Sequence, residues 1–395
     1  STAWVITQHL PTARPIEGSP RYGSHVHERY LALVIVIAVG VAACTASEAT
    51  SGDGSAVTTT TQAVVTTLPP VETTTTVPPT TTATATTTTT VRPRLETPKQ
   101  RLVVSGTGDV NLDPTFVRSF PSTGYEDAWT GLFGAFLADD LTIVNLECSP
   151  SNLGAPWAKP WTFRCDPEAL PSMAAAGVDI ANLANNHGMD YGFDAMLDGM
   201  ENLRNVGIEP VGTGADIDEA YEPVVMEING WTIAVIGSGG VNPESGSWLA
   251  LEDRPGMTHG DDTESIARAI EAASEYADLV FVTAHWGDQG TFTPRAFERR
   301  QAEAWIEAGA DGVFGHHQHV LQPLEFHQGK PIAWGLGNFV WQAYPPVSRT
   351  TAIAQFVFEP DGRIGACLVP VVIERSGHPV VQDPDAPVCA PAGGR

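Results

Sequence analysis

The chain has 395 residues and a formal net charge of −25 at pH 7, with 46 acidic and 21 basic side chains. The first 100 residues carry equal numbers of both signs, so the excess negative charge belongs to the remaining residues. A surface this acidic repels phosphate backbones and anionic lipid headgroups, which excludes nucleic acid as an expected partner. Any anionic substrate would need a local cation, and a bound metal ion is the simplest source.

The first predicted element is a short apolar run from Leu31 to Ala43. It has 13 residues, whereas a membrane-spanning helix needs roughly 20. The length is typical of a signal peptide. The run ends in Val41-Ala42-Ala43-Cys44, which resembles the lipobox of bacterial lipoproteins, where the cysteine is acylated. We therefore expect residues 1–44 to be a signal segment with Cys44 as a lipid anchor on the extracytoplasmic side. The alternative is an ordinary signal peptide, which would make the protein secreted.

Residues 45–100 are rich in threonine, with proline and valine interspersed. This segment has few large apolar side chains to bury, so we expect a disordered linker that holds the following domain away from the membrane. Threonine-rich linkers can be O-glycosylated, but a plain spacer is the simpler interpretation.

Residues 101–375 alternate short apolar runs, typical of buried strands, with amphipathic helical segments. The expected strands are 102–104, 141–144, 179–183, 231–236, 279–282, 312–314, 332–334, 352–358 and 368–373, and the expected helices are 195–206, 265–276 and 295–308. The alternation predicts an α/β fold. We interpret residues 376–395 as a C-terminal tail.

Polar side chains follow many of these strands, at the edge where open α/β sheets build their sites. Six of them carry oxygen or imidazole donors: Asp109, Glu147, Asn186, His285, His317 and His319. This donor set suits divalent Mn, Zn or Fe. On an extended segment, His317 and His319 would face the same side and reach two adjacent ions, which a carboxylate such as Asp109 could bridge. Singly, each residue could equally be a turn residue, a helix cap or a core imidazole. Together they favour a metal centre.

Six motifs carry a specific resemblance. They are Gly108-Asp109-Val110, Asn145-Leu146-Glu147, Ala184-Asn185-Asn186-His187 with Asp190-Tyr191-Gly192, His285-Trp286-Gly287, Gly315-His316-His317-Gln318-His319 and Gly335-Leu336-Gly337-Asn338-Phe339. In order and spacing they resemble the CapA family, named for bacterial poly-γ-glutamate capsule synthesis. The resemblance implies a calcineurin-like metallophosphoesterase fold, a four-layer αββα sandwich, with two divalent ions. It also implies that Asp109 bridges the ions, that the other five donors complete the site, that His187 protonates a leaving oxygen, and that Asp190 orients His187.

One position departs from the calcineurin-like pattern. A histidine usually stands two residues after the first aspartate, and this chain has Asn111 there. A site with a single ion is therefore the alternative to a two-ion centre. Lys159 and Arg164, in the loop after Glu147, are candidate contacts for a substrate anion, as is Asn338. The alternative for the two basic residues is that they are solvated loop charges.

Four cysteines remain besides Cys44, namely Cys148, Cys165, Cys367 and Cys389. An even number in an exported protein predicts two disulfides. Of the three connectivities, the simplest joins cysteines that are near in sequence, Cys148 with Cys165 and Cys367 with Cys389.

The residues and the resemblance together predict a metal-dependent, phosphoesterase-like hydrolase or transferase. Its substrate would be an anionic cell-envelope polymer or a phosphorylated precursor of one. The alternative is a non-catalytic subunit that binds or assembles the polymer in the same pocket. In either case the expected partners include membrane-bound capsule-synthesis proteins.

Overall fold

The computed structural model describes residues 4–5, 97–241, 247–342, 346–385 and 389. The predicted lipid anchor Cys44 and the predicted linker up to residue 96 lie outside these residues, so their predictions stay predictions. No helix among the described residues is long and apolar enough to cross a membrane.

The first sheet contains four parallel strands in sequence order. It runs β16-β15-β2-β3-β4-β5, and β2 is parallel to β3, β3 to β4 and β4 to β5. Two long antiparallel strands, β15 and β16, continue it on the other side of β2. Its strands are β2 (Leu102–Val110), β3 (Leu141–Leu146), β4 (Ile180–Asn182), β5 (Glu209–Val211), β14 (Asn338–Val340), β15 (Thr350–Phe358), β16 (Ile364–Ile373) and β17 (Pro379–Val381), with β1 (Trp4–Val5) paired to β16.

The second sheet has the order β12-β13-β11-β10-β8-β7, with a parallel centre and an antiparallel strand at each edge. Its strands are β7 (Val224–Ile228), β8 (Trp231–Gly239), β10 (Leu279–His285), β11 (Gly312–His316), β12 (Leu324–His327) and β13 (Lys330–Ala333). A separate short pair joins β6 (Thr213–Gly214) to β9 (Gly256–Met257).

The longest helices follow strands in the chain. They are α4 (Phe193–Asn205), α6 (Thr263–Ser274) and α7 (Ala296–Glu307). At the start of α6 the Asp262 side chain accepts a hydrogen bond from the Ser265 N–H at 3.0 Å, the usual N-cap arrangement. The shorter helices are α1 (Phe120–Thr123), α2 (Asp127–Thr130), α3 (Leu170–Ala175) and α5 (Ile217–Tyr221), with 3₁₀ turns at Ala135–Leu137, Pro167–Ala169 and Pro346–Arg349.

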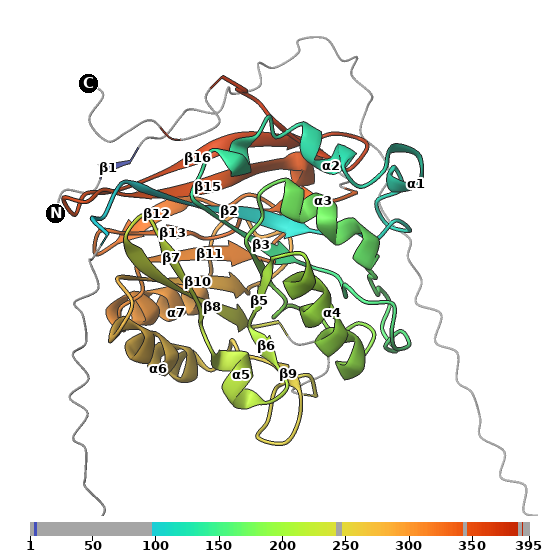
Figure 1. Cartoon of the computed structure of the whole chain (residues 1–395), viewed down its shortest axis with the longest axis horizontal. Coiled ribbons are helices and arrows are strands. Elements are labelled where there is room, and N and C mark those ends of the chain that lie inside the picture. Colours follow the sequence, from blue (N-terminus) through green and yellow to red (C-terminus); the bar gives the residue numbers. More distant parts are fainter. Residues whose placement is uncertain (1–3, 6–96, 242–246, 343–345, 386–388, 390–395) are drawn as a thin grey trace, which may run out of the picture. The chain divides into compact units, whose positions relative to one another are not determined.

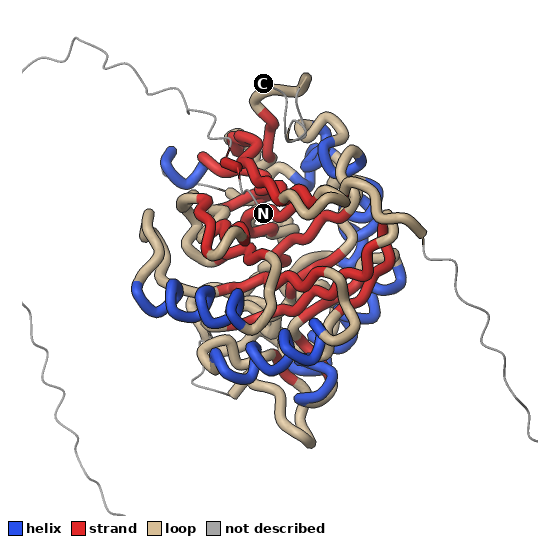
Figure 2. Tube along the Cα trace, turned by 90° about the vertical axis from the view of Figure 1, so that its left-hand side faces the viewer, coloured by secondary structure: helices blue, strands red, loops and turns tan. Residues whose placement is uncertain are grey.

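Alternating side chains divide the domain into four layers. On β10, Phe281 packs in the core between the two sheets, whereas its neighbours Val280 and Val282 pack against α6 and α7. The first sheet likewise has one face in the core between the sheets, and its opposite face packs against α3 and α4. Figure 1 shows α6 and α7 beside the sheet that contains β8 and β10, and in Figure 2 the strands lie between helices. The predicted four-layer αββα sandwich is confirmed.

Several of the predicted strands were too short. β2 continues through Asp109 to Val110, and β10 ends at His285, so both donors lie within strands and do not follow them. The predicted tail is wrong for Pro379–Val381, which forms β17 and pairs with β16. The domain also begins slightly earlier than predicted, because Lys99 forms an ion pair with Asp278 at 2.6 Å.

A half-buried carboxyl, Asp139, near the start of β3 predicts a pH-dependent stability. Burial raises the pKa of Asp139 to about 7, despite hydrogen bonds from Ser105 and Thr142. In the unfolded chain this carboxyl ionises near its ordinary value of 3.8. The folded state therefore holds the extra proton between about pH 4 and pH 7, so folding stability falls as pH rises through this range.

We expect the wild type to lose ~3 kcal/mol more stability than Asp139→Asn between pH 5 and pH 8. Urea unfolding of both proteins at the two pH values measures the difference. Equal pH dependence in the two proteins would contradict the assignment.

Candidate metal centre

The two sheets present their ligand-type residues at the same end of the sandwich. The first sheet supplies Asp109 at the end of β2, Glu147 directly after β3 and Asn186 shortly after β4. The second sheet supplies His285 at the end of β10, and His317 and His319 after β11. β2, β3 and β4 are parallel to one another, as are β10 and β11, so the carboxyl ends of both sets meet here. The structure brings all six predicted donors together.

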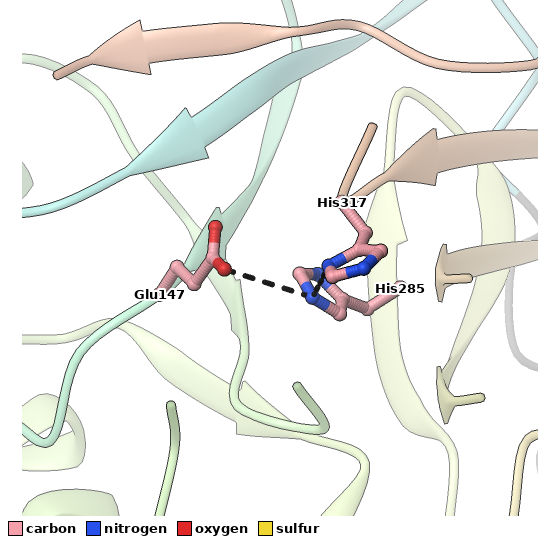
Figure 3. Close-up of side chains that lie close together, drawn as sticks. All are labelled: Glu147, His285 and His317. Carbon is pink, nitrogen blue, oxygen red and sulfur yellow. Dashed lines mark hydrogen bonds and ion pairs between the residues drawn. The ribbon is translucent and has the colours of Figure 1, made fainter. Parts of the chain in front are cut away.

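These donors form two groups that share one carboxylate. Glu147, His285 and His317 place one ligand atom each within 4.8 Å of one another, and so do Asp109, Glu147 and His319. Oε1 of Glu147 lies 3.7 Å from Nε2 of His285 and 3.9 Å from Nε2 of His319. Figure 3 shows the Glu147 carboxylate facing the His285 ring, which in turn contacts His317.

The residue common to both groups is Glu147, whereas the resemblance gave the bridging place to Asp109. Oδ1 of Asp109 already accepts a hydrogen bond from Nδ2 of Asn145 at 2.9 Å. Its Oδ2 lies 3.0 Å from Nδ1 of His319, on the side of one group only. The geometry therefore favours Glu147 as the bridge and Asp109 as a ligand of one ion.

Unsatisfied buried atoms show that a cation fits this site. Both carboxylate oxygens of Glu147 are buried without a hydrogen-bond partner among the described residues, and Oδ2 of Asp109 and Nδ1 of His319 are buried with only each other, at 3.0 Å, as a polar neighbour. Buried polar atoms are rarely left in this state, because each one costs free energy. Divalent ions would satisfy all four atoms at once, and the mixture of carboxylate and imidazole suits Mn, Zn or Fe.

The pKa values of the donor side chains agree with a bound cation at this site. Burial raises the pKa of Glu147 well above its ordinary value, and the nearby Asp109 carboxylate raises it further. Burial alone would also raise the pKa of Asp109, but the neighbouring His319 imidazole outweighs it and holds the pKa below the ordinary value. Burial lowers the pKa of His317 to about 3 and that of His285 far below its ordinary value. Both imidazoles are therefore neutral, the form that binds metal.

The segment that carries the last two histidines is not extended, as the sequence analysis assumed. His317 has φ 92° and His319 has φ 55°, both in the left-handed region that L-residues seldom adopt. The turn directs the two rings to different groups: Nδ1 of His317 lies 3.0 Å from Nε2 of His285, whereas His319 approaches Asp109. Strained backbone of this kind is concentrated at functional sites.

The predicted proton-transfer pair is assembled beside the donors. Nδ1 of His187 lies 2.6 Å from Oδ2 of Asp190, which also accepts the Phe163 N–H. Nζ of Lys159 lies 2.5 Å from the other oxygen of Asp190 and bonds to the Asn186 carbonyl. Burial lowers the pKa of His187, while Asp190 opposes the shift. Lys159 is therefore a buried partner of Asp190, and the alternative of a solvated loop charge is wrong for it.

The other two predicted substrate contacts are engaged in structural bonds. The Arg164 guanidinium donates to the carbonyls of Ser151 and Leu153, each at 2.9 Å, and its Cζ lies 3.7 Å from the Tyr191 ring centre. Nδ2 of Asn338 donates to the His319 carbonyl at 3.2 Å, which supports the strained turn. Asn111 is also buried, and its Oδ1 accepts the Asp113 N–H at 2.9 Å.

Sequence reasoning missed Asn145 and His316. Nδ2 of Asn145 contacts both Asp109 Oδ1 and His285 Nδ1, so one amide orients donors from both sheets. Asn145 belongs to the motif Asn145-Leu146-Glu147, but the sequence alone assigned no role to its side chain. His316 is fully buried, with Nδ1 4.0 Å from Asp109, and burial lowers its pKa to about 4. The only sequence signal for His316 was its place in the histidine cluster.

Two disulfides join the expected neighbours, Cys148 with Cys165 and Cys367 with Cys389. The first closes the loop that carries Lys159 and Phe163 to the site.

We expect Cys148→Ser with Cys165→Ser to lower the free energy of unfolding by ~3 kcal/mol, because the bridge spans 17 residues. Urea unfolding measures the change, and unchanged stability would contradict it. Cys367→Ser with Cys389→Ser is the control, which should leave the site loop in place.

A family-level comparison matches residues 103–343 to the bacterial capsule synthesis protein PGA_cap. The PGA biosynthesis protein CapA of Bacillus subtilis is 29% identical over 73% of this chain and 78% of its own length. The capsule biosynthesis protein CapA of Bacillus anthracis is 30% identical over 54% of this chain. The match spans 52% of that relative's own length.

Solved structures with a similar chain path include two proteins of low sequence identity. A hypothetical protein from Thermus thermophilus has a TM-score of 0.45 at 16% identity, covering 68% of this chain and 99% of its own. A 5'-nucleotidase from Candida albicans has a TM-score of 0.42 at 12% identity, covering 69% of this chain and 51% of its own.

Proposed function

Since the chain belongs to the bacterial capsule synthesis protein (PGA_cap) family, we propose that it is a divalent-metal-dependent hydrolase of cell-envelope polymer synthesis. Its substrate in this proposal is an anionic polymer of the poly-γ-glutamate type or a phosphorylated precursor. The observation that supports catalysis is the pair of ligand groups sharing Glu147, beside a histidine that is bonded to a buried aspartate.

The protein's own residues divide the work in this proposal. Bound divalent ions would supply Lewis acidity to the bond being broken. Asp109, Glu147 and the three histidines would hold the ions, together with Asn186, whose Oδ1 lies 2.7 Å from Nε2 of His285.

His187 is the proposed proton carrier. Its Nδ1 is held by Asp190, and its Nε2 has no hydrogen-bond partner among the described residues. Nε2 is therefore the atom that can exchange a proton with a substrate. In hydrolysis of a phosphoester, the oxygen of water bonds to phosphorus and the bond to the leaving oxygen breaks. The leaving oxygen takes a proton from His187, and a proton from the water restores it.

One observation favours the alternative, a subunit that binds or assembles polymer without turnover. Burial holds the pKa of His187 below its ordinary value, so its acid form is scarce at neutral pH in the free protein. Reconstituting the full chain with Mn²⁺, Zn²⁺ or Fe²⁺ and assaying bis-p-nitrophenyl phosphate and oligo-γ-glutamate separates the two. Turnover that depends on added metal supports the hydrolase, whereas no turnover with metal bound supports the binding subunit.

The proposal also places the protein outside the cytoplasm, tethered through acylated Cys44. The signal-like run and its lipobox-like end support it. Cys44→Ser is expected to move the protein from the membrane fraction to the soluble fraction of expressing bacteria. An unchanged membrane fraction would contradict the tether.

A further inference from the structure

A pocket of about 630 Å³ lies close to the metal centre, in the part of the chain that the structure describes. Its walls come from the segment before α1, the disulfide loop, the residues after β14 and the turn between β16 and β17. The side chains that matter to its chemistry are Phe116, Arg118, Trp161, Phe163, Gln342 and Arg375.

Aromatic side chains connect this pocket to the site. The Phe163 ring lies 4.3 Å from the His187 ring, measured between centres. Phe116 and Phe163 also contact Trp341, whose ring lies 4.7 Å from that of His319. A molecule in the pocket would therefore lie one aromatic side chain, Phe163, away from the proposed proton carrier. Two aromatic side chains, one pocket ring and then Trp341, would separate it from the proposed metal ligand His319.

The pocket is locally basic although the chain is strongly acidic. Arg118 and Arg375 line it, and both are exposed. Neither forms an ion pair with an acidic side chain among the described residues, whereas Arg268, Arg295, Arg299 and Arg363 all do. No acidic residue lines the pocket. These two guanidinium groups give the pocket a local positive charge, which favours an anion as its occupant although the chain has a net charge of −25.

The same pocket offers apolar surface to its occupant. Trp161 is 66% exposed, which is unusual for so large an apolar side chain. It stands at the pocket with the Phe116 and Phe163 rings. An occupant that fits both features carries carboxylates for the arginines and aliphatic carbons for the rings.

We propose that this pocket, here named the arginine pocket, binds a segment of a carboxylate-rich chain built from linked glutamate units. Each unit of such a chain has one carboxylate and a run of methylene carbons, so it satisfies Arg118 and Arg375 together with the aromatic wall. A polyphosphate would use only the arginines. The assignment rests on the proposed function in that it gives the polymer named there a binding place beside the metal centre, but it needs neither bound metal nor turnover.

The test measures binding in the absence of metal. Fluorescence anisotropy of a labelled oligo-γ-glutamate, titrated with the full chain in EDTA, gives the dissociation constant. We expect Arg118→Gln and Arg375→Gln each to weaken binding about fivefold and the double variant more, with the effect shrinking at high salt. Trp161→Ala should weaken binding to a similar degree. Arg300→Gln and Phe292→Ala, which change exposed residues outside the pocket, are the matched controls and should bind as the wild type does.

Two results would overturn the assignment. One is that the Arg118 and Arg375 variants bind as the Arg300 control does. The other is that inorganic polyphosphate of equal charge competes as well as unlabelled oligo-γ-glutamate and Trp161→Ala has no effect, because the pocket would then select charge alone. If the wild type binds oligo-γ-glutamate in EDTA but does not hydrolyse it with metal bound, the proposed catalysis is contradicted. The binding role of the arginine pocket is then still supported.

Discussion

Replacing Glu147 by glutamine is expected to remove both metal ions and to lower metal-dependent turnover by at least ~100-fold. Glu147 belongs to both ligand groups, and neither of its buried oxygens has a hydrogen-bond partner among the described residues. Glutamine keeps the shape but has no negative charge to bridge two cations. Elemental analysis after dialysis, together with the turnover rate, measures both effects.

The matched variants are His317→Ala and His319→Ala, each of which belongs to one group only. Each should lower the metal content by about one ion per chain, since it removes a ligand of a single ion. In EDTA, Glu147→Gln should be more stable than the wild type, because burial and Asp109 disfavour the Glu147 carboxylate. Full metal content in Glu147→Gln would contradict the bridging role.

Replacing His187 by alanine is expected to lower kcat by ~10²–10⁴-fold while the metal content stays that of the wild type. His187 is bonded to Asp190 and is in neither ligand group, so its loss removes proton transfer and leaves the donors in place. Steady-state kinetics on a phosphodiester substrate and elemental analysis of the same sample measure the two quantities.

A substrate with an acidic leaving group provides the control for this variant. p-Nitrophenolate leaves without needing a proton, so the loss should be much smaller on this substrate than on an alkyl phosphodiester. Asp190→Asn should give an intermediate loss, because it keeps the position of the ring but not the charge that favours its protonation. An equal loss on both substrates would contradict proton donation by His187.

The sequence pattern predicted the architecture well because most strands are buried runs with alternating faces. Val280, Phe281 and Val282 on β10 face alternately the helix layer and the core between the sheets, as period-two alternation requires. Strand ends were predicted less well, because polar donors such as Asp109 and His285 break the apolar run before the backbone pairing stops. β17 was missed because three residues give little periodicity.

The donor set could be read from the sequence, but its internal geometry could not. Spacing alone suggested an extended His317-Gln318-His319, whereas the backbone there has positive φ at both histidines. The bridging place was given to Asp109 because nothing in the sequence shows that Asn145 occupies one of its oxygens. Lys159 and Arg164 looked alike in sequence, yet the first bonds to Asp190 and the second to loop carbonyls. These differences depend on contacts between distant residues.

The most direct test is a crystal structure of the Mn²⁺-reconstituted protein with anomalous diffraction data collected at the manganese edge. We expect two anomalous peaks ~3.5–4 Å apart, one on each side of the Glu147 carboxylate. The first should lie against His285 and His317, and the second against Asp109 and His319. An absence of peaks within coordinating distance of Glu147 would contradict the central claim that this residue joins two metal sites.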